Sequence, residues 1–88
     1  MNTLSINKEI EVNAFSFVNR HGLSSVPRTI TVDDRQYSFV DTGIRYLIRK
    51  GEALSRLFDM TDGQRTFRLR HDEDHWTLIS IKGQGHDN

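Results

Sequence analysis

Residues 56–70 read RLFDMTDGQRTFRLR, a stretch that predicts a β-hairpin. Asp62-Gly63 is a strong signal for a two-residue hairpin turn, because the central positions of such a turn need a left-handed backbone. Apolar residues alternate with polar ones on both sides of it: Phe58, Met60, Phe67 and Leu69. A two-residue turn would place Phe58 opposite Phe67 and all four apolar side chains on one face.

The residues that follow, TFRLRHDEDHWTLISIK at 66–82, predict a second turn onto another strand. With residues 71–74 as a four-residue loop, Leu69 opposes Trp76, which extends the same apolar face. A three-residue loop would instead set Arg70 against Trp76.

Residues 29–40 predict a third hairpin upstream. Asp33-Asp34 would form its two-residue turn, since aspartate tolerates a left-handed backbone better than most residues do. The chain before this hairpin, around Pro27, is predicted to be a loop. The predicted apolar face consists of Ile30, Val32, Tyr37 and Phe39.

Two segments match both a helix and a strand. Residues 5–22 place apolar side chains at helical spacing, with Ser5 as the start and Gly22 as the end, whereas residues 9–12 alternate as a strand does. A helix is preferred here. Residues 44–58 also have helical spacing, but Gly51 interrupts them, and a strand from Ile44 to Lys50 is preferred.

Composition favours strands over helices. Val, Ile, Thr, Phe, Tyr and Trp total 27 residues, whereas Ala, Glu and Lys total nine. The sequence therefore predicts a mainly β fold in one small domain over residues 1–82, followed by a flexible tail at 83–88. We expect an antiparallel meander or partly closed barrel of about five to six strands, with one N-terminal helix.

Charge and cysteine content indicate the cellular compartment and the classes of partner to expect. The 88-residue chain has no cysteine and a formal net charge of zero, so a reducing compartment suits it and no bulk field draws it to nucleic acid or lipid. The first ten residues have no signal-peptide pattern, and no apolar run could span a bilayer. We expect a cytoplasmic protein without membrane contact. Homodimerisation is one way for so small a domain to bury more surface.

The segment from His71 to His75, His-Asp-Glu-Asp-His, resembles a metal site in composition alone. Two histidines four residues apart converge on one ion when they lie on a helix, but the flanking residues predict strands. Asp72 also stands where a zincin motif needs glutamate. The preferred interpretation is a solvated hairpin loop, with no metal and no cofactor.

Arginine accounts for nine of the twelve basic residues, which raises the alternative of nucleic-acid binding. Arg68 and Arg70 would share the outer face of one strand, Arg45 and Arg49 align on another, and aromatic rings could stack on bases. Outward arginines are also typical of an ordinary solvated face, and Asp59 would lie diagonal to Arg68. The candidate binding residues are Arg45, Tyr46, Arg49, Arg68 and Arg70.

The segment Phe39-Val40-Asp41-Thr42-Gly43 resembles the Asp-Thr-Gly signature of the retroviral-type aspartic proteases. Those enzymes are small β-rich homodimers in which each chain gives one carboxylate. The resemblance implies that Asp41 pairs with its counterpart across a dimer axis and shares one proton to activate water. Ile44 stands where the family has a small residue, and Asp-Thr-Gly is also a favourable turn sequence.

Catalytic motifs other than this one are missing from the sequence. There is no phosphate-binding glycine loop and no nucleophile elbow. The preferred interpretation is a non-catalytic binding or regulatory module that acts on a protein partner through a sheet face or edge. The alternatives are nucleic-acid binding through an arginine-rich outer face and a homodimeric aspartic-protease-like enzyme using Asp41.

Overall fold

The computed structural model describes residues 3–19 and 23–83, which form seven strands and no helix. The strands are β1 (Thr3–Asn19), β2 (Leu23–Val32), β3 (Arg35–Ser38), β4 (Asp41–Lys50), β5 (Ala53–Thr61), β6 (Arg65–Asp72) and β7 (His75–Gly83). They form one antiparallel sheet in the order β3-β2-β1-β7-β6-β5-β4. The mainly β prediction is confirmed, but there are seven strands rather than five to six.

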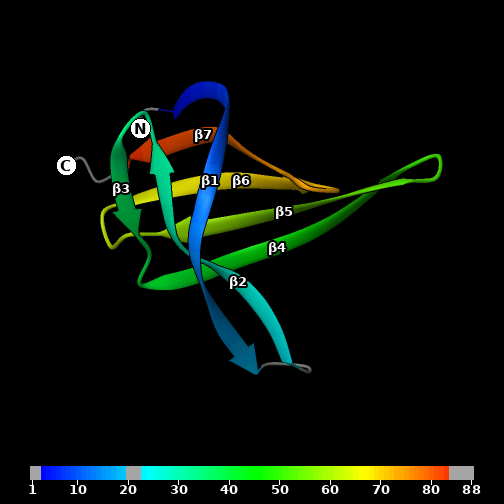
Figure 1. The fold of residues 1–88 in the computed structure, drawn as a ribbon, viewed down its shortest axis with the longest axis horizontal. Helices are drawn as coiled ribbons and strands as arrows, with labels where there is room; N and C mark the ends of the chain where they lie inside the picture. Colours follow the sequence, from blue (N-terminus) through cyan, green and yellow to red (C-terminus); the bar gives the residue numbers. More distant parts are fainter. Residues whose placement is uncertain (1–2, 20–22, 84–88) are drawn as a thin grey trace.

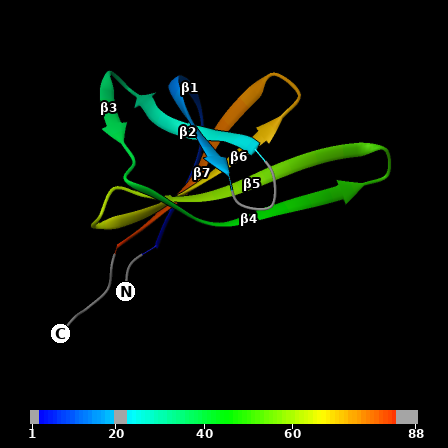
Figure 2. The same cartoon turned by 90° about the horizontal axis from the view of Figure 1, so that it is seen from below.

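A two-residue link joins the opposite ends of this sheet. β3 and β4 are the two outermost strands in the order, yet only Phe39 and Val40 separate them in the chain. The Phe39 N–H donates to the Arg28 carbonyl on β2, and the Val40 N–H donates to the Thr61 carbonyl on β5, both at 2.8 Å. The sheet therefore curls until its ends meet at this link, and β2 crosses over β4 and β5 (Figures 1 and 2).

The core lies inside the curl. Its buried residues are Ile10, Val26, Ile30, Phe39, Phe58, Met60, Phe67, Leu69 and Leu78. Phe67 is fully buried, and its ring lies 5.2 Å from each of the rings of Tyr37 and Phe39. We call the face that carries these residues the inner face and the opposite face the outer face. The apolar faces predicted for the hairpins are the ones that form this core.

The predicted N-terminal helix is wrong, because residues 3–19 form the long strand β1. The first part of β1 pairs with β7 and the second part with β2, with register shifts between Ser5 and Lys8 and again between Val12 and Phe15. A bulge adds one residue to a strand, so the inward-facing positions before and after it are no longer two residues apart. The spacing of the apolar residues then resembles that of a helix. Residues 20–22, where the helix was to end, lie outside the described residues.

The loop predicted around Pro27 is also wrong, since β2 runs through it. Pro27 lies opposite Phe15 of β1, and β3 pairs only with the part of β2 from Thr29 onward. A proline lacks the N–H of a ladder bond, and this part of β2 has a described strand on one side only. The hairpin that follows is confirmed, with Ile30 opposite Tyr37 and positive φ angles of 51° and 68° in its two-aspartate turn.

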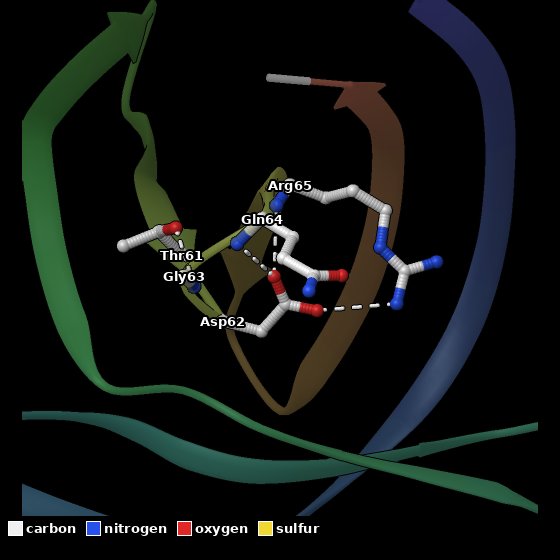
Figure 3. Close-up of polar contacts among 5 residues, drawn as sticks. All are labelled: Thr61, Asp62, Gly63, Gln64 and Arg65. Atoms are coloured by element: carbon white, nitrogen blue, oxygen red, sulfur yellow. Dashed lines mark hydrogen bonds and ion pairs between the residues drawn. The ribbon is translucent and has the colours of Figure 1, made fainter. Parts of the chain in front are cut away.

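The turn at Asp62 contains more residues than predicted, because Thr61 pairs with Thr66. Figure 3 shows the polar contacts within it. Asp62 Oδ1 accepts hydrogen bonds from the N–H groups of Gln64 (2.9 Å) and Arg65 (2.8 Å), while Thr61 Oγ1 accepts one from Gly63 N–H (3.0 Å). These bonds hold residues 62–65 as a wider turn that puts Thr61 opposite Thr66. The predicted pairing of Phe58 with Phe67 is therefore wrong.

The slip between β5 and β6 amounts to two residues, so every side chain keeps its predicted face. Met60 lies opposite Phe67, and Phe58 lies opposite Leu69. The alternation of apolar residues was sufficient to predict the faces, but the pairing depended on side-chain hydrogen bonds in the turn.

The turn between β6 and β7 contains fewer residues than predicted. Asp72 lies opposite His75, so the turn consists of Glu73 and Asp74 alone, with Glu73 at a φ of 50°. Both predicted registers are wrong, since Leu69 faces Leu78 rather than Trp76. From Leu69 to the turn this slip is again two residues relative to the four-residue loop, which keeps Leu69 and Leu78 on the apolar face. A register shift between Arg68 and Leu69 adds a third residue beyond that point, so Phe67 faces Ile81.

The strand predicted from Ile44 to Lys50 is confirmed as part of β4. Gly83 is the last residue of β7, and the rest of the predicted tail, residues 84–88, lies outside the described residues. In the described part of the chain, no helix is long and apolar enough to cross a membrane.

Candidate binding surface

The hairpin of β4 and β5 extends past the tip of the β6–β7 hairpin as an arm (Figures 1 and 2). We define the arm as residues 45–57. Its outermost pair with β6 is Ser55 with Asp72, and farther out only β4 and β5 pair with each other. Large apolar side chains are exposed on or beside this arm: Ile44, Tyr46, Leu47, Ile48 and Leu54. Leu47 is 63% exposed.

The five predicted binding residues lie on both faces of the sheet. Residues directly opposite each other share a face, and so do alternate residues of one strand. Arg45 lies opposite the core residue Phe58, so Arg45 and Arg49 are on the inner face. Tyr46 lies between them in sequence and therefore on the outer face.

Arg68 and Arg70 lie on the outer face, so the structure brings them together with Tyr46 and separates them from the other two arginines. Arg68 lies opposite Asp59 and makes two bonds to its carboxylate, at 2.8 and 3.0 Å. Its guanidinium also lies 5.3 Å from the centre of the Tyr46 ring. Arg70 lies 2.6 Å from the carboxylate of Asp72. Both outer-face arginines are therefore already paired with aspartates.

The pKa values of these groups agree with the pairing. The hydrogen bond to Asp59 raises the pKa of Arg68, although partial burial opposes it. A hydrogen bond from the Ser55 hydroxyl is the main cause that lowers the pKa of Asp72, and Arg70 adds to it against partial burial. The raised pKa of Arg68 and the lowered pKa of Asp72 both favour the charged form of the side chain, as expected for groups held in ion pairs.

The inner face of the arm has a different character. Leu47 lies opposite Arg56, and Arg49 lies opposite Leu54, so the strand positions alternate between arginine and leucine on both strands. These inner-face residues are Arg45, Leu47, Arg49, Leu54 and Arg56. No carboxylate occupies an inner-face position of β4 or β5 between residues 45 and 57; Glu52 lies in the turn.

Aromatic rings continue the inner face beyond Arg56. His71 lies opposite Arg56, and its ring stacks on Trp76 with the ring centres 4.1 Å apart and the planes at 7°. Phe15 of β1 lies 6.1 Å from Trp76 and is 46% exposed. An open groove between the arm and the β6–β7 turn is lined by Glu52, Ala53, Leu54, Arg56, His71, Asp72 and Glu73.

The two histidines of the His71 to His75 segment lie on opposite faces. His71 is on the inner face against Trp76, whereas His75 is on the outer face, where its Nδ1 lies 3.1 Å from Glu9 Oε2. Two imidazoles on opposite faces of a sheet cannot bind one ion together. Across residues 3–19 and 23–83, no group of three or more His, Cys, Asp or Glu side chains is arranged to hold a metal.

Asp41 is the first residue of β4, opposite Thr61. Its Oδ1 accepts a hydrogen bond from the Thr42 N–H at 2.8 Å. It borders an open cleft of about 140 Å³ where the two ends of the sheet meet, beside Arg28 and Met60. That volume is below the roughly 300 Å³ of typical ligand pockets. Pairing of two Asp41 carboxylates needs a second chain, and it stays a prediction.

Sequence reasoning missed Arg56, Leu47 and Leu54 as candidate residues. The signal was present, since arginine and leucine alternate on both sides of Gly51. It was obscured because residues 44–58 also have helical spacing, and in a helix these side chains would not share a face. Once Lys50 and Ala53 pair across the Gly51-Glu52 turn, the arginines align.

Comparisons of the chain with protein-family models, with curated proteins and with solved structures give no match.

Proposed function

We propose that this protein is a non-catalytic binding module that takes an extended segment of a protein partner along the free edge of β4. The observation that carries the proposal is the exposure of this edge strand. All ten residues of β4 except Thr42 are exposed, and apolar side chains occur on both of its faces.

An edge strand of this kind has unpaired N–H and C=O groups that an added strand can satisfy. Proteins usually protect such an edge with charges, a bulge or a covering segment. β4 has a bulge between Thr42 and Arg45 and two arginines, but no described strand covers residues 45–50. Edge binding accounts for the apolar side chains kept exposed there, whereas a solitary domain gains nothing from them.

Nucleic-acid binding through the outer face has less support. The arginines on which it depended, Arg68 and Arg70, pair with Asp59 and Asp72. A phosphate would have to compete with these carboxylates, which reduces the gain from counterion release.

Affinity capture from the source cell tests the proposal with a matched pair of variants. Leu47 and Leu4 are equally exposed, at 63% each, but Leu4 lies on β1 away from the arm. We expect proteins retained by the wild type and by Leu4→Lys to be lost with Leu47→Lys, and nuclease treatment to change nothing. Equal retention by both variants, or retention that nuclease abolishes, would contradict the proposal.

A further inference from the structure

Building on the proposed function, we infer that the segment bound along β4 is an acidic one, with two carboxylates four residues apart and apolar residues between them. The inference specifies the chemistry of the partner. It depends on the register of β4, on the charge of the two faces of the arm and on the poor fit of β4 to a second copy of itself.

The register of β4 determines which face of an added strand meets which side chain. Arg45, Leu47 and Arg49 present arginine, leucine and arginine on the inner face, at alternate positions. Tyr46 and Ile48 present apolar surface on the outer face. Because directly opposed residues share a face, the complementary five residues are acidic, apolar, apolar, apolar and acidic. The carboxylates then lie beside Arg45 and Arg49, and the central side chain lies beside Leu47.

Charge favours carboxylates on the inner face only. The side chains of Arg49 and Arg56 form no hydrogen bond or ion pair with any described residue, and both are exposed. On the outer face, Arg68 is held by two bonds to Asp59. A partner carboxylate opposite Arg49 therefore gains an arginine without displacing an aspartate, whereas one opposite an outer-face arginine would compete with Asp59 or Asp72.

A second copy of the chain is a poorer occupant of this edge. The antiparallel register that matches the apolar residues best sets Leu47 against Leu47 and Tyr46 against Ile48. The same register places Arg45 directly opposite Arg49 at both ends, and opposed like charges are destabilising. The arginines thus select against self-pairing and for an acidic strand.

Nucleic acid is also a poorer occupant. It has no strand backbone to pair with the edge, and Glu52 and Glu73 border the groove beside Arg56. Neither carboxylate lies along the free edge of β4, because Glu52 is in the turn that follows Lys50 and Glu73 is in the β6–β7 turn, on the other side of β5.

Fluorescence polarisation with labelled synthetic peptides tests the inference. The probe contains Glu-Val-Leu-Val-Glu between Ser-Gly flanks. One control peptide has lysine in place of both glutamates, and another, Glu-Glu-Val-Leu-Val, keeps the composition but puts one acid on the outer side. We expect saturable binding of the probe alone, with amide shifts confined to the arm.

Arginine variants identify the face used. We expect Arg49→Gln to weaken probe binding by about threefold to fivefold, and Arg45→Gln/Arg49→Gln by about tenfold or more. Arg35→Gln is the control and should change nothing, because this exposed arginine follows the Asp33-Asp34 turn and belongs to neither strand of the arm. Thermal melts confirm that each variant is folded.

Four results would overturn the inference: no probe binding up to about 1 mM; equal binding of the three peptides; stronger, arginine-dependent binding of a labelled oligothymidine; or a wild-type dimer in sedimentation that Leu47→Lys dissociates. These outcomes are separable from failure of the proposed function. Partner capture that still requires Leu47 would preserve edge binding while excluding the acidic segment.

Discussion

At the scale of single residues, Phe67 is where the two layers of the curled sheet meet. It is fully buried on β6, and the rings of Tyr37 and Phe39 pack on it from the other layer. Truncating Phe67 to Ala should lower the free energy of unfolding by about 3 to 5 kcal/mol, because a cavity opens between the layers. Urea denaturation measures the loss. Phe67→Leu, which fills most of that volume, should cost clearly less.

Arg68, the next residue in the chain, should behave differently. Its side chain is 40% exposed and paired with Asp59 on the outer face. Arg68→Ala should therefore cost only about 1 kcal/mol or less in the same denaturation experiment. A loss as large as that of Phe67→Ala would show that the inner and outer faces of β6 have been assigned the wrong way round.

At the scale of elements, the Asp62 turn makes stability depend on pH. Partial burial opposes ionisation of Asp62, but hydrogen bonds from the Gln64 and Arg65 N–H groups and from the Arg65 guanidinium outweigh it and lower its pKa. A carboxyl whose pKa is lower in the folded state stabilises above its unfolded pKa and loses that contribution as pH falls through the folded pKa. Asp72 acts in the same direction.

The free energy of unfolding should therefore decline between about pH 5 and pH 2. Asp62→Asn should be less stable than the wild type at pH 7 and should show a shallower decline. Urea denaturation at a series of pH values measures both slopes. Parallel curves for the two proteins would mean that the Asp62 carboxylate contributes nothing to the acid transition.

The glycine of this turn carries a separate prediction. Gly63 has a φ of +99° with no atom near the position of a Cβ, so the cost of a side chain there is backbone strain alone. Gly63→Ala should lower stability by about 1 to 3 kcal/mol. Gly51, at a φ of +62° in the β4–β5 turn, is closer to the left-handed region that other residues can adopt. Gly51→Ala should therefore lower stability less than Gly63→Ala, and thermal melts of the two variants measure the difference.

The elements also show what the sequence could predict. Alternation was enough to place Phe58, Met60 and Phe67 on one face, because faces depend on local order in the chain. Pairing was not predictable, because the Asp62 carboxylate widened its turn by two residues. β1 was misassigned because its bulges break the alternation, and a bulge becomes recognisable only when both neighbouring strands are known.

At the scale of the whole molecule, the sequence was sufficient to predict which strands carry the candidate residues but not which face of the sheet each residue occupies. The five residues were correctly grouped by strand, but Arg45 and Arg49 lie on the opposite face from Arg68 and Arg70. Their relation across strands depends on the Gly51 turn and on the bulge between Thr42 and Arg45, neither of which the spacing of arginines reveals. The Arg68–Asp59 pair depends instead on the register of β5 and β6, whereas Arg70 and Asp72 are alternate residues of β6.

The tip of the arm, residues 49–54, should be dispensable for stability. Lys50 and Ala53 are the pair that flanks the two-residue turn at the tip, and Ile48 and Ser55 form the pair two positions farther from the tip. Because the two pairs occupy equivalent positions of one ladder, a two-residue turn can also join Ile48 to Ser55. Replacing residues 49–54 with Asn-Gly should shift the melting temperature by only a few degrees, about 1 kcal/mol or less, since these residues are exposed. Differential scanning calorimetry checks this, and a large loss would mean that the arm supports the core.

The pairing of β1 with β7 has a consequence for how the chain folds. Thr3 lies opposite Lys82, so a ladder in the middle of the sheet joins residues at the two extremes of the described chain. Contacts of such high sequence separation slow folding, because the entropy of closing the loop is lost before the contact forms. A circular permutant that connects residue 82 to residue 3 by a short linker, and opens between Asp33 and Asp34, would turn this ladder into a hairpin. It should refold faster than the parent and keep the edge of β4 unchanged.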